Sequence, residues 1–413
     1  MDYIKRERYL AQLIRAKHNR LIKVITGIRR VGKSFLLDPL FTTHLIESGV
    51  KESQIIKINL DDEENKELLD AHKLSSYIRA KLISDENYYV IIDEIQKVEG
   101  FEAILNGLLY LRNVDVYVTG SNSKFLSRDI ITEFRGRSHQ IKVYPLSFAE
   151  FLTATQLDKR EAYQEYVRYG GMPQLINLQT EQEKTKYLKD LFELTYLKDI
   201  IERNELERDD VLDAIVNMLA SAVGSLTNPY KLTNTFKSHG MKELSINTVR
   251  KYIDFLIDDF LVEKVERYDV KGKKYIQNIA KYYFADVGLR NARMNFRQQE
   301  ENKIMENIVY LELLRRGYNV DVGIVEVREG DARKQLEIDF VCNQSFQRYY
   351  IQVTQHLETR EKTKQKSRSL LKIEDNFKKV IIVKDDILPW ITEEGILVLG
   401  MMQFSLDAES LNI

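Results

Sequence analysis

Short apolar runs alternate with stretches of helical periodicity over the first 145 residues of the chain. β-Branched and aromatic residues dominate the runs, and each of the first four is followed by a polar loop and a helix-like segment. The five runs are LIKVIT (21–26), IIKINL (55–60), YYVIID (88–93), VDVYVTG (114–120) and HQIKVYPL (139–146). This alternation predicts a parallel sheet covered by helices on both faces.

From about residue 147 to 222 the pattern is helical, with few strand candidates and one marked break at YGGMP (169–173). Over 210–290, two helical segments precede SINTVRKYIDFLIDD, where Ser245 is a candidate N-cap. Two strand-like pieces follow, LVEKVERYDV and KKYIQNIAKYYF. Three helices and a hairpin predict a winged helix-turn-helix. A helical spacer with an incidental hairpin is the alternative.

The C-terminal part of the chain, from about residue 300, changes pattern again. A helical segment, ENKIMENIVYLELLRRG, ends at Gly317, and three strand candidates follow: YNVDVGIVEV, LEIDFVCN and RYYIQVTQ. A charged helix near 358–375 and the strands KKVIIVKD and GILVLG complete the chain. The order helix, three strands, helix, strand predicts a compact α/β domain.

Composition narrows the class of protein. A length of 413 residues corresponds to roughly two to four domains. The single Cys342 excludes an internal disulfide framework and fits a reducing cytosol. No apolar run approaches the roughly 18–20 residues that cross a bilayer, so we expect a soluble, cytoplasmic protein without a membrane partner. Because Lys+Arg number 62 against 63 Asp+Glu, any attraction to nucleic acid must come from local patches.

A phosphate-binding loop is predicted at GIRRVGKS (27–34), which matches G-x-x-x-x-G-K-[ST] in full. Gly27 and Gly32 let the backbone N–H groups around Arg30 point toward phosphates. The positive end of the following helix also favours phosphate binding. Lys33 would reach the β- and γ-phosphates, and the Ser34 hydroxyl would ligate Mg²⁺. Because the motif lies between a predicted strand and a predicted helix, it indicates binding of ATP with Mg²⁺. An ordinary glycine-rich turn is the alternative.

The third apolar run ends in Asp93 and Glu94, about 60 residues after the loop. At this position Asp93 would hold the Mg²⁺, and Glu94 would orient and deprotonate a water. A second acid of this kind is typical of nucleotide hydrolases that carry their own base, rather than of kinases or Ras-like switches.

Two further segments add candidates for groups that act on the transition state. In VTGSNS (118–123), either Ser121 or Asn122 could contact the attacking water or the γ-phosphate, and a plain polar turn is the alternative. In FRGR (134–137), Arg135 and Arg137 are placed like arginine fingers, with a solvated basic turn as the alternative. Whether such fingers act within one chain or on a neighbouring subunit stays open.

Together these segments resemble the AAA+-type ATPases that carry an uncharacterised C-terminal half. The resemblance follows GIRRVGKS, DEIQ, TGSNS, FRGRS with YPLSFAEF, GGMP and LKDIIERN over nearly the whole chain. It implies an α/β chain with a P-loop AAA+ core of the additional-strand type (1–150) and a helical lid or linker (151–208). A winged helix-turn-helix (209–292) and a restriction-endonuclease-like, PD-(D/E)XK-type domain (293–413) would follow. The resemblance also implies a homo-oligomer.

The nuclease resemblance can be tested position by position. That fold needs an acid on its first helix, an Asp in one strand and a Glu-x-Lys in the next, for a metal and its water. Glu306 and Asp339 fill the first two places, but the third reads Gln352-Val353-Thr354. Gln352 offers a neutral oxygen, whereas Thr354 does not replace an ammonium. We therefore expect a degenerate, non-cleaving site used for binding or assembly.

Two basic patches bear on whether the protein contacts nucleic acid. Residues 1–30 carry nine Lys/Arg against two acids, and 360–372 carry six against one. Contact with nucleic-acid phosphates and an ordinary solvated face are the two interpretations. The sequence thus predicts an Mg-dependent ATPase coupled to a C-terminal module that contacts nucleic acid or a partner. A nucleotide-dependent switch or assembly scaffold, and an ATP-regulated nuclease, are the alternatives.

Overall fold

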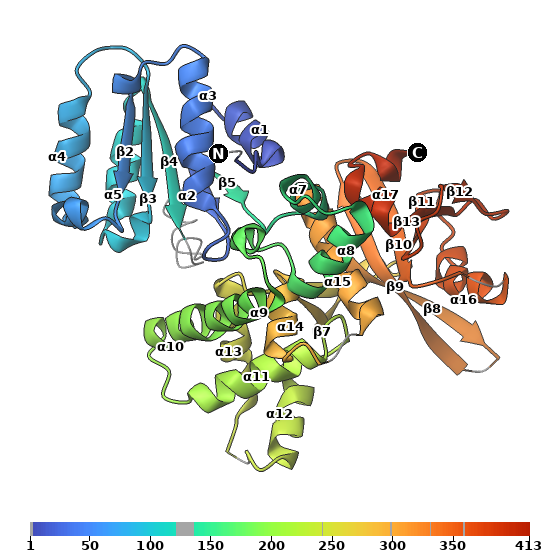
Figure 1. Cartoon of the computed structure of the whole chain (residues 1–413). Helices are drawn as coiled ribbons and strands as arrows, with labels where there is room; N and C mark the ends of the chain where they lie inside the picture. Colours follow the sequence, from blue (N-terminus) through green and yellow to red (C-terminus); the bar gives the residue numbers. More distant parts are fainter. Residues whose placement is uncertain (1–2, 121–135, 242, 298–299, 331, 358–359) are drawn as a thin grey trace. The chain divides into compact units, whose positions relative to one another are not determined.

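The computed structural model describes residues 3–413 apart from 121–135, 242, 298–299, 331 and 358–359. The chain divides into two compact units, one of residues 1–144 with 258–260 and one of residues 145–257 with 261–413 (Figure 1). Across the described residues, no helix has both the length and the apolar character needed to cross a membrane.

The first unit is built on a five-stranded parallel sheet with the order β2-β3-β4-β1-β5. Its strands are β1 (Ile22–Thr26), β2 (Ile55–Asn59), β3 (Tyr88–Asp93), β4 (Val114–Gly120) and β5 (Ser138–Lys142). Its helices are α1 (Glu7–Arg15), α2 (Lys33–Phe35), α3 (Thr42–Glu47), α4 (Ala71–Lys81) and α5 (Phe101–Leu109). The predicted parallel sheet is confirmed, and β4 separates β1 from β3 as an additional strand.

Both faces of this sheet are buried, which explains why its strands are apolar throughout. Val116 and Val118 of β4 pack into a core with residues of α4 and α5, including Leu74 and Leu105. Tyr117, which lies between the two valines, points the other way and its ring lies 4.7 Å from that of Phe41. A strand that is covered on both faces shows no polar alternation.

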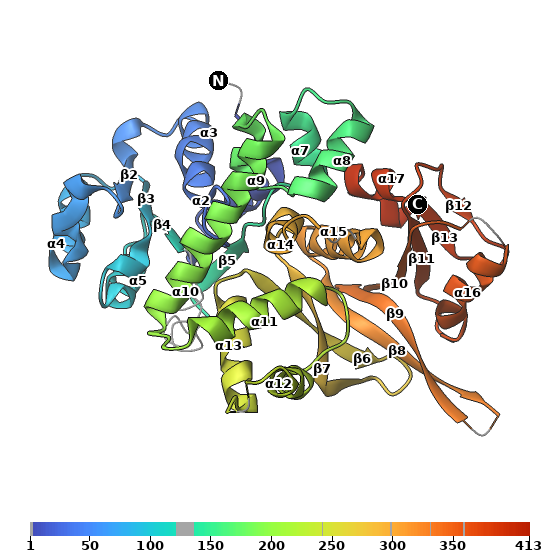
Figure 2. The same cartoon turned by 60° about the horizontal axis from the view of Figure 1, so that its bottom comes forward.

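The second unit begins with helices and ends in a mixed α/β arrangement. Its helices are α7 (Phe148–Ala154), α8 (Lys159–Tyr169), α9 (Glu181–Asp190), α10 (Lys198–Arg203), α11 (Asp209–Ser221), α12 (Pro229–Ser238), α13 (Ile246–Asp258), α14 (Val287–Arg293), α15 (Glu301–Arg315), α16 (Arg360–Leu371) and α17 (Met401–Leu406). Its strands are β6 (Val262–Asp269), β7 (Lys274–Phe284), β8 (Asn319–Glu329), β9 (Ala332–Gln344), β10 (Gln347–Thr354), β11 (Lys378–Val383), β12 (Trp390–Ile391) and β13 (Leu397–Gly400). They form one eight-stranded sheet with the order β12-β13-β11-β10-β9-β8-β6-β7 (Figure 2).

The three helices and the hairpin predicted between 210 and 290 are present as α11, α12, α13 and β6–β7. Ser245 caps α13 as expected, because its hydroxyl accepts a hydrogen bond of 3.0 Å from the N–H of Thr248. The hairpin does not stand alone, however: β6 also pairs in parallel with β8, with Arg267 opposite Val322. Residues 209–292 and 293–413 therefore share one sheet. Their assignment as winged-helix and nuclease-like domains, with those boundaries, stays a prediction.

The GGMP segment forms a close backbone contact inside the second unit. The N–H of Gly171 donates to Asp286 at 2.7 Å, and Asp286 also caps α14 by accepting from the N–H of Leu289 at 3.1 Å. A Cβ on Gly171 would lie 2.3 Å from the carbonyl oxygen of Leu146, so this position requires glycine. Burial raises the pKa of Asp286 to about 6, although its backbone N–H partners act in the opposite direction. The segment thus joins the end of α8 to the start of α14.

Candidate functional site

The predicted phosphate loop connects β1 to α2 in the first unit. Gly27 has a φ of +140°, and a Cβ there would lie 2.2 Å from the carbonyl oxygen of Val143. Gly32 has a φ of +92°, and Arg30, with a φ of 64°, also adopts the left-handed conformation. The loop backbone therefore depends on its glycines for a shape that other side chains rarely allow. Ser34 is exposed in the first turn of α2.

The helix expected after the loop is shorter than the sequence indicates. α2 ends at Phe35, and a π-helical segment (Leu36–Phe41) leads into α3. Asp38 has non-helical angles, with φ −136° and ψ 112°, directly before Pro39. Proline disfavours helical angles in the preceding residue and lacks an N–H of its own, which explains the break.

Lys33 lies folded against the loop that it follows. Its ammonium donates hydrogen bonds to the carbonyl oxygens of Gly27 at 3.1 Å and Ile28 at 3.4 Å, and the residue is 5% exposed. Burial lowers the pKa of Lys33, while the negative charges of Glu94 and Asp93 act to raise it. The ammonium thus lies against the loop carbonyls and interacts electrostatically with both acids.

Thr119 connects the two acids that end β3. Its hydroxyl donates to a carboxylate oxygen of Asp93 and accepts from the N–H of Glu94 at 3.0 Å. Glu94 has a φ of 55° and is 9% exposed, and its carboxylate also accepts from the side-chain amide of Gln96. Left-handed backbone at a non-glycine residue is costly and is concentrated at functional sites. The chain thus turns sharply at Glu94 while Thr119 holds both acids.

Strand register brings these groups to one edge of the sheet. Thr26, the last residue of β1, pairs with Gly120, and Ile92 of β3 pairs with Val118 of β4. The carboxyl ends of β1, β3 and β4 therefore meet where the phosphate loop, Asp93 and Glu94 begin. This is the edge at which parallel α/β sheets bind ligands.

Of the remaining catalytic candidates, the structure describes only Arg137. Ser121, Asn122 and Arg135 lie outside the described residues. Arg137 is exposed and directly precedes β5, where its carbonyl oxygen accepts from the N–H of Ile22 at 2.9 Å. It lies at the amino ends of the strands, whereas the phosphate loop of its own chain lies at their carboxyl ends. The length of β1, about five residues or roughly 16 Å, separates the two. An arginine side chain does not extend that far, so Arg137 cannot act within its own chain in this arrangement.

Sequence reasoning missed Thr119 and Gln96. The sequence favoured Ser121 and Asn122 in the loop after β4, whereas Thr119, the penultimate residue of β4, makes the contact to both acids. Thr119 is completely buried. The sequence signal for its role was a polar residue near the end of an apolar central strand.

The acids of the predicted degenerate nuclease site meet a lysine that sequence reasoning also missed. The ammonium of Lys281, on β7, lies 2.7 Å from Glu306 of α15, 2.7 Å from Glu337 and 3.8 Å from Asp339, both of β9. Burial alone would lower the pKa of Lys281, but the three carboxylates together raise it above its ordinary value. Burial and the charge of Glu306 raise the pKa of Asp339 to about 6.

The structure does not bring Gln352 into this cluster. Phe340 stacks on Tyr310 of α15, and its partner Ile351 on β10 shares that face of the sheet. The pairing of β9 with β8 shifts register between Ile338 and Val341, so Asp339 and Phe340 do not follow simple alternation. Gln352, the residue after Ile351, points to the other face, where its amide donates to Ser369 of α16 and to the carbonyl of Glu337, each at 2.8 Å.

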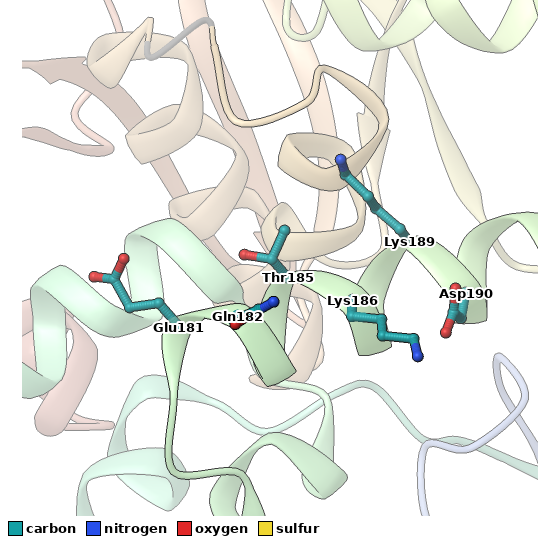
Figure 3. A pocket seen from close by; sticks show the side chains of 6 residues that line it. All are labelled: Glu181, Gln182, Thr185, Lys186, Lys189 and Asp190. Carbon is teal, nitrogen blue, oxygen red and sulfur yellow. The ribbon is translucent and has the colours of Figure 1, made fainter.

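The second unit has a surface hollow that is lined by one helix, α9. Its residues, shown in Figure 3, are Glu181, Gln182, Thr185, Lys186, Lys189 and Asp190, which form a polar stripe along α9. Because a single helix supplies every lining side chain and the hollow is open to solvent, we assign it no ligand.

Comparison with known proteins gives family matches over much of the chain. A family model described as an AAA domain matches residues 19–152, and one described as a domain of unknown function (DUF8612) matches 160–300. An uncharacterised protein of Haemophilus influenzae is 38% identical over 385 residues, which span 92% of this chain and 93% of that protein. An uncharacterised protein of Methanocaldococcus jannaschii is 26% identical over 336 residues, spanning 78% and 71%. The Aeropyrum pernix ORC1 protein, solved in complex with DNA, covers 71% of this chain and 94% of its own at 13% identity and a TM-score of 0.31.

Proposed function

The chain belongs, with the Haemophilus influenzae protein, to a family that carries an N-terminal AAA domain, and from this premise we propose that it binds and hydrolyses Mg-ATP. The observation that carries the proposal is the meeting of Lys33, Asp93 and Glu94 at one edge of the sheet, with Thr119 joining the two acids.

Each residue has a distinct part in the proposed reaction. The loop N–H groups and the Lys33 ammonium bind the phosphates, and Lys33 exchanges its contacts with the loop carbonyls for phosphate oxygens. Hydroxyl and carboxylate oxygens are ligands that Mg²⁺ prefers, so Ser34 and Asp93 would hold the ion, which neutralises charge on the phosphates. Glu94 accepts the proton of the attacking water, and Thr119 keeps its backbone in place.

The proposal is tested by ATP turnover of the purified full chain. We expect ATP hydrolysis that requires Mg²⁺ and stops when EDTA removes it, because the phosphates carry charge that the protein alone does not neutralise. Phosphate release would be measured with Mg²⁺, with EDTA, and with EDTA followed by excess Mg²⁺. Turnover that is unaffected by EDTA, or a chain that binds no nucleotide, would contradict the proposal.

For the second unit, we propose contact with nucleic acid. Arg250 and Lys251 are exposed on α13, and Lys271, Lys273 and Lys274 are exposed around the β6–β7 turn. On α16 the exposed cations include Lys364 and Arg368. These groups favour contacts with phosphates rather than with base edges.

The N-terminal basic patch supports nucleic-acid contact less, because two of its cations serve the fold. Arg6 donates to the carbonyl of Val31 at 3.2 Å, and Lys23 forms a buried ion pair with Asp115. Measuring turnover with and without DNA or RNA at increasing salt separates a nucleic-acid substrate from the scaffold alternative, since phosphate contacts weaken steeply with salt.

Assembly gives a further prediction, which rests on the proposed ATPase. Because Arg137 lies at the edge of the sheet opposite the phosphate loop, a catalytic role requires that it reach the site of a neighbouring subunit. Specific activity should then rise with protein concentration. Mixing inactive Arg137→Ala chains with inactive Lys33→Ala chains should restore turnover, because each supplies the group that the other lacks.

The matched control is Arg112→Ala, since Arg112 is an exposed arginine that precedes β4 at the same edge of the sheet. That variant should keep full activity. Turnover that is independent of concentration, with no recovery on mixing, would show that Arg137 is no arginine finger.

A further inference from the structure

The resemblance to PD-(D/E)XK nucleases implies a divalent metal held by the acids around Glu306 and Asp339. The residues present do not fit such an ion. An ammonium already lies among the carboxylates, because Lys281 is within 2.7 Å of both Glu306 and Glu337. Among the described residues, no group of three or more His, Cys, Asp or Glu side chains is arranged to hold a metal.

The oxygens of Glu306 are engaged by protein donors. Its Oε1 accepts from Lys281 at 2.7 Å and from the hydroxyl of Tyr283 at 2.6 Å. Its Oε2 accepts from Lys303 at 3.2 Å, and the same ammonium donates to the carbonyl of Gly224 at 2.8 Å. Mg²⁺ needs about six oxygen ligands, and here it would have to displace two ammonium groups and a phenol from one carboxylate.

Asp339 and Gln352, the two strand positions of the nuclease pattern, are bonded to other protein groups. Asp339 accepts from the backbone N–H of Val353 at 2.8 Å, and its second oxygen faces Lys281 at 3.8 Å. Gln352 lies on the opposite face of the sheet, bonded to Ser369. A divalent ion and the Lys281 ammonium would also repel each other strongly in so buried a site.

We propose that the Lys281 ammonium takes the place of the divalent cation and forms, with Glu306, Glu337 and Asp339, a metal-free ion cluster that fastens β7 to α15 and β9. One ammonium has three N–H donors, and three carboxylates surround this one. β7 and β9 are not neighbours in the sheet, since β6 and β8 lie between them, so the cluster joins two strands that do not pair with each other. The side chains of Lys281 and Glu306 are only 1% and 2% exposed, so the ammonium itself is closed to a nucleic-acid phosphate, while Glu337 at the edge of the cluster is 36% exposed.

The first test compares the full chain with Asp339→Asn in the absence of nucleotide, with Mn²⁺ as the probe. Bound Mn²⁺ would be measured by electron paramagnetic resonance, and the melting temperature with and without Mn²⁺. Any weak binding at Ser34 and Asp93 is common to both proteins and cancels in the comparison. We expect the same Mn²⁺ affinity in both. A tenfold or greater loss of affinity in Asp339→Asn, or Mn²⁺-dependent DNA cleavage that Asp339→Asn abolishes, would overturn the proposal.

The second test removes the resident cation. Lys281→Met leaves buried carboxylates without their partner, so its melting temperature should fall by roughly 10 °C. Mn²⁺ should then raise that temperature by several degrees, an effect absent from the unmutated chain. A folded Lys281→Met protein that gains no stability from Mn²⁺ would overturn the claim that the ammonium takes the place of a divalent cation.

Lys281→Met/Glu306→Gln is the matched control, because it removes one buried charge of each sign. This variant should melt above Lys281→Met and should lose most of the response to Mn²⁺. A response as large as that of Lys281→Met would mean that Mn²⁺ binds elsewhere and would count against the proposal. If Lys281→Met does not fold, the comparison with Asp339→Asn decides the question alone.

Discussion

Replacing Glu94 by glutamine should reduce ATP turnover by about 10²–10⁴-fold while leaving the binding of Mg-ATP nearly unchanged. Glutamine has the size of glutamate and retains an oxygen that can accept from Gln96, but it cannot take a proton from water. Asp93, still held by Thr119, would continue to bind the metal. Single-turnover kinetics and a nucleotide-binding titration of the same preparation would separate the two effects.

Glu99→Gln is the matched control, since Glu99 is exposed in the segment that leads from β3 to α5. It should hydrolyse ATP at the unmutated rate. If Glu94→Gln retained turnover within about twofold of that rate, far short of a general base's contribution, Glu94 would not be the base. The chain would then hydrolyse ATP with a different base.

Lys33→Ala should lower the affinity for ATP by about 10–100-fold, the usual value of hydrogen bonds to charged groups. The ammonium lies at the loop, bonded to the carbonyl oxygens of Gly27 and Ile28, and would be lost as a donor to the phosphates. Because the substitution also removes donors from two loop carbonyls, the melting temperature should be measured alongside the binding isotherm.

The control for Lys33→Ala is Lys81→Ala, at the exposed end of α4. Both variants should remain folded, and only the first should lose affinity. Unchanged ATP binding in folded Lys33→Ala would remove the assignment of Gly27–Ser34 as the phosphate loop.

Local sequence signals were enough for the elements and for the main motif. Strand runs such as YYVIID and VDVYVTG are apolar because both faces of the first sheet are buried, and their spacing leaves room for covering helices. The loop of Gly27–Ser34 was identifiable because its glycines are required by the backbone itself, as the φ of +140° at Gly27 shows. The helix break at Asp38 was predictable in principle from Pro39, but the apolar pattern across 33–41 concealed it.

The sequence by itself therefore determined the parallel sheet, the phosphate loop and the paired acids, since each rests on neighbouring residues. Only the tertiary structure decided that Thr119 serves both acids, that Arg137 lies at the far edge, and that Lys281 fills the acidic cluster. Gln352 is the clearest case, because the register shift in β9 leaves Asp339 facing Lys281 while Gln352 bonds to Ser369, and a shift of one position changes every partner. Such contacts depend on strand register and on which elements a sheet places side by side, and Lys281 meets Glu306 across 25 residues of chain. Periodicity reports which positions are buried, but it carries no information about the residue on the other side of the contact.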